Sequence, residues 1–188
     1  MALNWEDILR RFNSYPPGVQ KLLPPCSEER LREVQSRLGK LPNGVIDMLR
    51  HFNGAGLFAA GTGPSVSIFG ISPIPSVLPG ERAMDWFIDM FTPRWRAGRC
   101  LPGEDRQNDW AIGMQNYGGV IIANVDGRVR EWDTAQRMWD PRTFNDFDEW
   151  VKVLLREGDE FLREAEDDPI DRELEGDAFV KKVYLPRP

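Results

Sequence analysis

The chain has 188 residues, of which 41% are hydrophobic and 29% charged, and its formal net charge is −6. The length suffices for one domain with its own core, and the composition is that of an ordinary soluble globular protein. No stretch of the sequence approaches the ~18 consecutive apolar residues of a membrane span, so we expect no membrane association. Residues 1–20 lack the basic start and apolar run of a signal peptide, so we expect a cytoplasmic location.

Charge is distributed unevenly along the chain. Residues 156–177 contain eleven acidic residues and three arginines, a net charge of −8, which leaves +2 on the rest. Direct binding of nucleic acid through this end is disfavoured, because phosphates require a basic surface. The segment is either a solvated acidic helix face and linker or a site that attracts a basic protein partner.

The first 40 residues predict helices around a short extended segment. Apolar residues in 3–12 follow the spacing of an amphipathic helix, and residues 19–23 predict a brief edge strand. Ser27 is a good N-cap for a second helix, which Gly39 ends.

Four residues bracket the next helix. Pro42, directly after Leu41, suits the first helical position because its missing N–H would have no helical partner there. Asn53 and Gly54 can take the left-handed conformation that ends a helix. The apolar stripe between them predicts a buried helix that fixes how the chain enters the sheet.

A glycine-rich run, residues 54–64, follows this helix and predicts a loop or a mobile flap. It contains a G-x-G-x-x-A pattern, but a dinucleotide site needs that pattern after a strand, so no cofactor role is predicted. Residues 65–71 alternate and predict a strand, and the glycine loop could form a flexible edge of a binding surface.

The middle of the chain predicts a helix over residues 81–91, ended by Pro93, and an irregular basic stretch over 94–106. Asp85 and Asp89 lie four residues apart on one face of that helix. They could share a metal ion or a proton, but a solvated helix surface is the favoured interpretation.

A β-meander is predicted next, with strands at 110–114, 120–125 and 129–132. Asp126-Gly127 is typical of a two-residue type I′ hairpin turn. Thr143 with Asp146 resembles a short capping box for a long final helix, which Gly158 kinks or ends unless the helix runs on to Asp167-Asp168-Pro169. The order of elements predicts an α+β fold with N-terminal helices, a mostly antiparallel sheet and a closing C-terminal helix.

Candidate catalytic groups are few. His51 is the one histidine of the chain, so neither a His-based triad nor a zinc hydrolase can be assembled from imidazoles. Cys26 and Cys100 lie far apart without C-x-x-C spacing, and Ser65 and Ser67 lack a G-x-S-x-G context. We therefore predict no catalytic residue, no cofactor and no metal.

Tryptophan is abundant, with seven residues. Trp150 has the phase of a core residue in the final helix. Trp95 and Trp139 fall in segments predicted to be irregular, which makes them candidates for a binding surface, although structural packing is the favoured alternative.

Three motifs together resemble the SUKH superfamily of Smi/Knr-like proteins. They are Leu38-Gly39 and Leu41-Pro42 with the following helix and Asn53-Gly54, the hairpin sequence DGRVREWD at 126–133, and Thr143-Phe144 followed by Phe147 and a Leu-Leu pair. The similarity spans about residues 27–156. It implies a single domain over 1–188, with a core of about 19–156 and an acidic C-terminal extension of about 157–188.

The resemblance also implies a non-enzymatic α+β protein. Bacterial members resemble immunity proteins that bind and neutralise a toxin domain, such as a nuclease, and fungal relatives are regulatory or scaffold proteins. We therefore expect a toxin-neutralising protein that acts by occlusion, with a regulatory or scaffold module as the alternative. An enzyme that uses Asp85 or Asp89 is the least favoured. The residues proposed to contact a protein partner are Trp95, Asp126, Asp133, Trp139 and Asp140.

Overall fold

The computed structural model describes residues 3–60, 63–72, 87–98 and 104–167, and its α+β architecture confirms the predicted fold class. The helices are α1 (Trp5–Ser14), α2 (Glu28–Leu38), α3 (Asn43–His51), α4 (Ile88–Ala97) and α5 (Phe147–Asp167). The strands are β1 (Lys21–Leu22), β2 (Ala55–Ala60), β3 (Gly63–Ile68), β4 (Asp109–Gln115), β5 (Val120–Asn124), β6 (Val129–Asp133) and β7 (Met138–Phe144).

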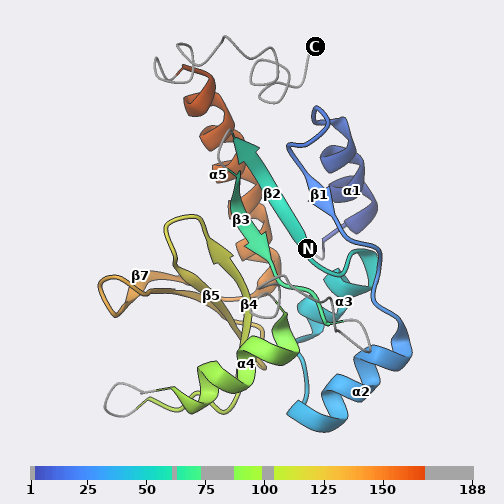
Figure 1. Cartoon of the computed structure of the whole chain (residues 1–188), viewed down its shortest axis with the longest axis vertical. Coiled ribbons are helices and arrows are strands. Elements are labelled where there is room, and N and C mark those ends of the chain that lie inside the picture. The colour runs from blue at the N-terminus through green and yellow to red at the C-terminus, as the bar shows by residue number, and fades with distance from the viewer. Residues whose placement is uncertain (1–2, 61–62, 73–86, 99–103, 168–188) are drawn as a thin grey trace, which may run out of the picture.

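All seven strands form one antiparallel sheet whose spatial order, β1 to β7, is the order of the chain. In Figure 1, α5 runs behind β2 and β3, and α1 lies beside β1. The closing C-terminal helix therefore packs mainly against β2, in the N-terminal half of the sheet.

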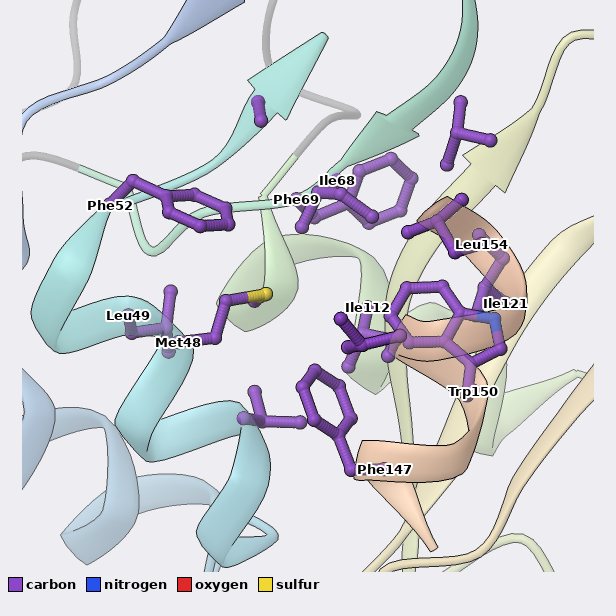
Figure 2. Packing of buried hydrophobic residues seen from close by; sticks show 14 of the residues in the cluster. Met48, Leu49, Phe52, Ile68, Phe69, Ile112, Ile121, Phe147, Trp150 and Leu154 are labelled. Carbon is purple, nitrogen blue, oxygen red and sulfur yellow. The ribbon is translucent and has the colours of Figure 1, made fainter. Parts of the chain in front are cut away.

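Both faces of the central strands are covered, which explains why β4 and β5 are buried almost continuously rather than alternately. Successive side chains of a strand point to opposite faces. Trp110 and Ile112 of β4 join the large cluster formed with α1, α3 and α5, whereas Ala111 between them packs with Trp95 of α4. Figure 2 shows Ile112 in this cluster. We call these two sides of the sheet the α5 face and the α4 face.

The large cluster reaches beyond the 19–156 range at both ends. Trp5, Ile8 and Phe12 of α1 are buried in it, and so is Leu162 near the end of α5. Figure 2 shows its centre, where Met48 and Leu49 of α3 approach Phe147 and Trp150 of α5. The N-terminal helix and most of α5 are thus parts of one hydrophobic core.

Local helix signals are reproduced closely. The Ser27 side chain accepts a hydrogen bond from the Arg30 N–H, and Gly39 follows the last residue of α2. Pro42 is the N-cap of α3 rather than its first helical residue, one position from the prediction. Gly54 has a φ of 101°, in the left-handed region, and Asn53 bridges to the backbone N–H and C=O of Ile71.

The prediction of a loop over residues 54–64 was wrong. Ala55–Ala60 is a strand, paired with β1 through Lys21↔Gly56 and with β3 through Leu57↔Val66. Backbone hydrogen bonds to a neighbour on each side stabilise β2, so its small side chains do not prevent strand formation. Leu57 and Phe58 are fully buried within it.

The predicted helix over 81–91 is displaced. Its first six residues lie outside the described part of the chain, and α4 begins at Ile88 and continues through Pro93 to Ala97. Proline there lacks the N–H that would bond to the residue four positions earlier. Tertiary contacts outweigh this loss, because Thr92 Oγ1 accepts the Ala111 N–H and Trp95 is buried against the sheet.

The β5–β6 turn is not the expected type I′. Gly127 has a positive φ of 94°, but Asp126 does not, and the Gly127 N–H bonds to the Asn124 C=O at 2.8 Å. A single left-handed glycine after such a turn is the arrangement of a longer hairpin loop.

The start of α5 also differs from the prediction. Thr143 belongs to β7, and the cap is Asp146, whose Oδ1 accepts the Glu149 N–H at 2.7 Å. The helix runs through Gly158 to Asp167 without ending at the glycine. A glycine is needed at this position because a Cβ there would lie 2.3 Å from the Phe58 ring.

The strand β7 forms one edge of the sheet and is capped against further pairing. Pro141 has no N–H to offer, and the next N–H, that of Arg142, bonds to Asp140 Oδ1 at 2.8 Å. Proline and side-chain caps are devices by which proteins protect exposed edges.

Candidate protein-binding surface

A buried carboxylate and an exposed aromatic ring meet near the β4–β5 turn. Glu131 of β6 is only 4% exposed. Its two carboxylate oxygens accept hydrogen bonds from Gln115 Nε2 and from the Tyr117 hydroxyl, each at 3.0 Å. Burial, and then the charge of Glu131, raise the pKa of the Tyr117 hydroxyl well above its ordinary value, so it stays a donor.

Arg142 of β7 links this carboxylate to two others. Its guanidinium lies 3.8 Å from Glu131, 3.2 Å from Asp140 and 2.8 Å from Glu157 of α5. The contact with Glu131 exceeds hydrogen-bond distance. Three carboxylates therefore surround one guanidinium, which leaves this part of the α5 face negative.

Two large apolar side chains stand out on the same part of the molecule. Tyr117 is 57% exposed and Met138 is 48% exposed. Met138 lies two residues before Asp140 on β7, so the two side chains share a face. Thr134 Oγ1, in the β6–β7 turn, donates to the Gly118 C=O at 2.9 Å and joins the two turns. We call Tyr117, Glu131, Met138, Asp140 and Arg142 the Tyr117 surface.

The residues expected to contact a partner are separated by the fold. Asp140 belongs to the Tyr117 surface. Asp133, at the end of β6 beside Met138, accepts the N–H groups of Ala135 and Gln136 and shapes the adjoining turn. Asp126 is exposed in the turn at the opposite end of β6.

The two tryptophans of that set lie on the α4 face and pack together with a third. Trp95, Trp132 and Trp139 have ring centroids 5.2–6.0 Å apart in edge-to-face pairs. The Arg106 guanidinium stacks 4.0 Å from the Trp95 centroid, and Arg130 lies 3.9 Å from that of Trp139. Trp95 lies in α4 and Trp139 in β7, so the prediction of irregular segments at these positions was wrong. Trp95 is only 8% exposed, which agrees with the favoured alternative of structural packing.

Asp89 is buried, contrary to the expectation of a solvated helix surface, while Asp85 lies outside the described residues. The Asp89 carboxylate accepts hydrogen bonds from Arg30 at 2.9 Å, Arg37 at 3.2 Å, and the N–H and hydroxyl of Ser72 at 2.9 and 2.7 Å. This cluster joins α2 and α4 to the chain leaving β3.

A hollow of about 350 Å³ adjoins this cluster, and several of its polar lining residues are already bonded within the protein. Arg30 bonds to Ser72 and to the carboxylate behind it, and Asn53 bonds to Ile71. Burial raises the pKa of the Cys26 thiol, which keeps this group in its weakly nucleophilic form.

The remaining candidates from the sequence have structural contacts. His51 stacks on Trp5 with centroids 5.6 Å apart and bonds to the Asp47 C=O. Across the ranges that the structure describes, histidine, cysteine and carboxylate side chains do not gather in groups of three or more able to hold a metal ion. Within the same ranges, none of the helices has the length and apolar character needed to cross a membrane.

Sequence reasoning missed Tyr117 and Glu131. Tyr117 lies between two predicted strands, directly before Gly118 and Gly119, and this turn composition was the signal available for it in the sequence. Glu131 lies in the DGRVREWD segment, where only its neighbours drew attention. Its burial depends on Tyr117 and Arg142, which are distant in sequence.

Comparison with known proteins adds no assignment, since neither a protein-family model nor a curated protein matches the chain. The similarity of its motifs to the SUKH superfamily stays a prediction.

Proposed function

We propose that this protein is a non-enzymatic, SUKH-like immunity protein that binds a toxin domain through the Tyr117 surface and blocks it by occlusion. The observation that carries the proposal is the pairing of exposed apolar side chains with carboxylates. Tyr117 and Met138 are two of the three large hydrophobic residues exposed in the described ranges. Glu131 accepts the Tyr117 hydroxyl, and Asp140 lies on the same face of β7 as Met138.

The composition of this surface supports protein binding over simple solvation. Tyrosine and methionine are enriched in protein interfaces, and aromatic anchors contribute most of the binding energy. The neighbouring carboxylates would form the polar rim around such an anchor. An interface of this composition fits a partner with apolar contacts surrounded by basic groups.

Charge supports a toxin that acts on nucleic acid. The groove of a nuclease must be basic to bind phosphates. An inhibitor with a formal net charge of −6 would be steered toward such a groove and would associate rapidly with it. Carboxylates of the Tyr117 surface would then occupy positions that phosphates take in the substrate complex.

Co-expression with a panel of bacterial toxin domains, scored by survival of the host cell, tests the proposal. The wild-type chain is expected to rescue growth against at least one toxin. Asp140→Lys, which reverses a charge on the Tyr117 surface, should lose most of that protection. Asp47→Lys, at an exposed acid of α3, is the matched control and should protect fully.

Failure of the wild-type chain to protect against every toxin would contradict the proposal, as would equal loss in both lysine variants. Affinity purification from the producing cell provides an independent check. Recovery of a housekeeping or signalling protein, bound through the same surface, would favour the regulatory or scaffold alternative.

A further inference from the structure

From the way its ring is held, we infer that Tyr117 is the anchor of this surface and that its open face receives an arginine side chain of the partner. The inference rests on the proposed function, in that it assigns the contact surface to a basic protein. It adds the chemical identity of the group that is recognised and the residue that recognises it.

The Tyr117 ring is fixed although more than half of it is exposed. It lies against the backbone of Gly119, where an added Cβ would be 2.5 Å from ring atom Cε2. The turn beneath is closed by the Gln115 N–H to the Gly119 C=O at 2.7 Å and by the Gly118 N–H to the Gln115 C=O at 2.9 Å. A pre-positioned ring loses little conformational entropy when it binds.

The hydroxyl of Tyr117 points inward and is already used. It donates to Glu131 Oε2 at 3.0 Å, which ties the polar end of the side chain to the protein. The exposed area is therefore mainly ring, so a partner would meet the π-face rather than the phenol oxygen. An electron-rich face beside a carboxylate attracts cations.

Other rings of this chain show which cation suits such a place. Guanidinium groups of its own arginines lie over four tryptophans: Arg106 over Trp95 and Trp132, Arg130 over Trp139, and Arg96 over Trp110.

In the described part of the chain, no arginine is placed over Tyr117 in the same way. Its open face is therefore a comparable binding site for a guanidinium group of a partner protein.

Arginine suits this binding site better than lysine does. A guanidinium can stack flat on the ring while its edge donates to a carboxylate, whereas an ammonium is a compact and strongly hydrated charge. Asp140 supplies a carboxylate on the same face, where Arg142 lies 3.2 Å from it and 3.8 Å from Glu131, the acceptor of the Tyr117 hydroxyl. The partner is thus expected to insert an arginine between the ring and Asp140.

Titration of the full chain with an oligo-arginine peptide, and with an oligo-lysine peptide of the same length, tests the inference by NMR. The arginine peptide should bind more tightly and perturb amide signals at residues 116–119 and 131. Tyr117→Ala should weaken its binding about tenfold, the size expected for loss of a cation–π contact. Gly119→Ala, which displaces the ring without changing charge, should weaken it similarly.

Leu23→Ala removes an exposed apolar residue on another part of the molecule and should leave the affinity unchanged. Equal affinities for the two peptides, or unchanged binding by Tyr117→Ala with an unchanged melting temperature, would overturn the inference. These outcomes are separate from the co-expression result. A wild-type chain that binds the arginine peptide at Tyr117 but protects against no toxin would refute the proposed function alone.

Discussion

Two buried carboxylates of this protein, Asp89 and Glu131, are each 4% exposed but have opposite surroundings. Asp89 is bound by the guanidinium groups of Arg30 and Arg37 and by Ser72, all from its own chain. Glu131 is bound by two neutral donors, one of them the hydroxyl of the exposed Tyr117, and has an arginine only at 3.8 Å.

The difference separates a structural role from an interaction role. Charge-assisted hydrogen bonds from its own arginines neutralise Asp89 inside the fold. Glu131 keeps a negative charge just beneath an exposed ring, with its neutral partners aligned by the β4–β5 turn. We expect loss of Asp89 to affect stability most and changes around Glu131 to affect binding most.

The largest effect is expected for Asp89→Ala. Its removal leaves the buried Arg30 with only the half-exposed Glu33 as a counter-charge and takes a carboxylate partner from Arg37 and Ser72. The free energy of unfolding should fall by about 3 kcal/mol, the lower end of the range for a broken buried ion pair. Urea denaturation followed by circular dichroism measures this loss. Asp47→Ala is the control, because that exposed carboxylate pairs with Arg50 and should contribute less than ~1 kcal/mol. Similar losses in the two variants would mean that the Asp89 cluster does not stabilise the fold more than an exposed ion pair does.

Glu131→Gln should cost much less, about 1 kcal/mol. The amide oxygen can still accept from Tyr117, and Gln115 can turn its own amide to accept from the new NH2, so the main loss is the charge toward Arg142. The same denaturation experiment measures it. A destabilisation as large as that of Asp89→Ala would remove the distinction between the two carboxylates.

The titration of Tyr117 gives a further, smaller test. Its pKa is higher in the folded chain than its ordinary value of about 10, so the folded state holds this proton more tightly than the unfolded state. The resulting stabilisation is complete below pH ~10 and is lost as pH rises through the folded-state pKa. The melting temperature of the wild type should therefore fall more steeply above pH ~10 than that of Tyr117→Phe. Parallel curves would show that the hydroxyl is not tied to Glu131.

Gly119→Ala should have a comparably small effect on stability, about 1 kcal/mol. The ring that it displaces can move into solvent, but its hydroxyl then loses the hydrogen bond to Glu131. Its readout is the amide spectrum of residues 115–119 together with the melting temperature. A strongly destabilised Gly119→Ala would indicate that the ring is a packing residue of the core rather than a surface anchor.

Local signals in the sequence predicted the helices well where capping residues were decisive. Ser27 and Gly39 correctly bracket α2, since caps act through neighbours a few residues away. The predicted left-handed stop at Asn53-Gly54 is only approximate, because α3 ends at His51 with Phe52 as an extended C-cap and only Gly54 has a positive φ. The meander was likewise predicted from alternation and the Asp126-Gly127 turn.

Elements stabilised by distant partners were the ones predicted incorrectly. β2 has few large side chains, and it depends on hydrogen bonds to β1 and β3. The helix α4 passes through Pro93 because of burial against β4, and β7 contains a proline that normally argues against a strand.

The site shows the same limit. Of the five predicted contact residues, only Asp140 lies on the Tyr117 surface, because strand register decides which acids meet. Burial of Asp89 and Glu131 is set by arginines and a tyrosine that lie 14 to 59 positions away in the chain, and single-sequence patterns carry no information about such pairs.

The protected edge of the sheet has a consequence for assembly. β1, at one end, offers only two residues for pairing, and β7, at the other, presents Pro141 and an N–H already bonded to Asp140. Chains concentrated in a cell are therefore poorly suited to polymerise strand against strand. Complexes made through side chains on one face would instead have a fixed and finite stoichiometry.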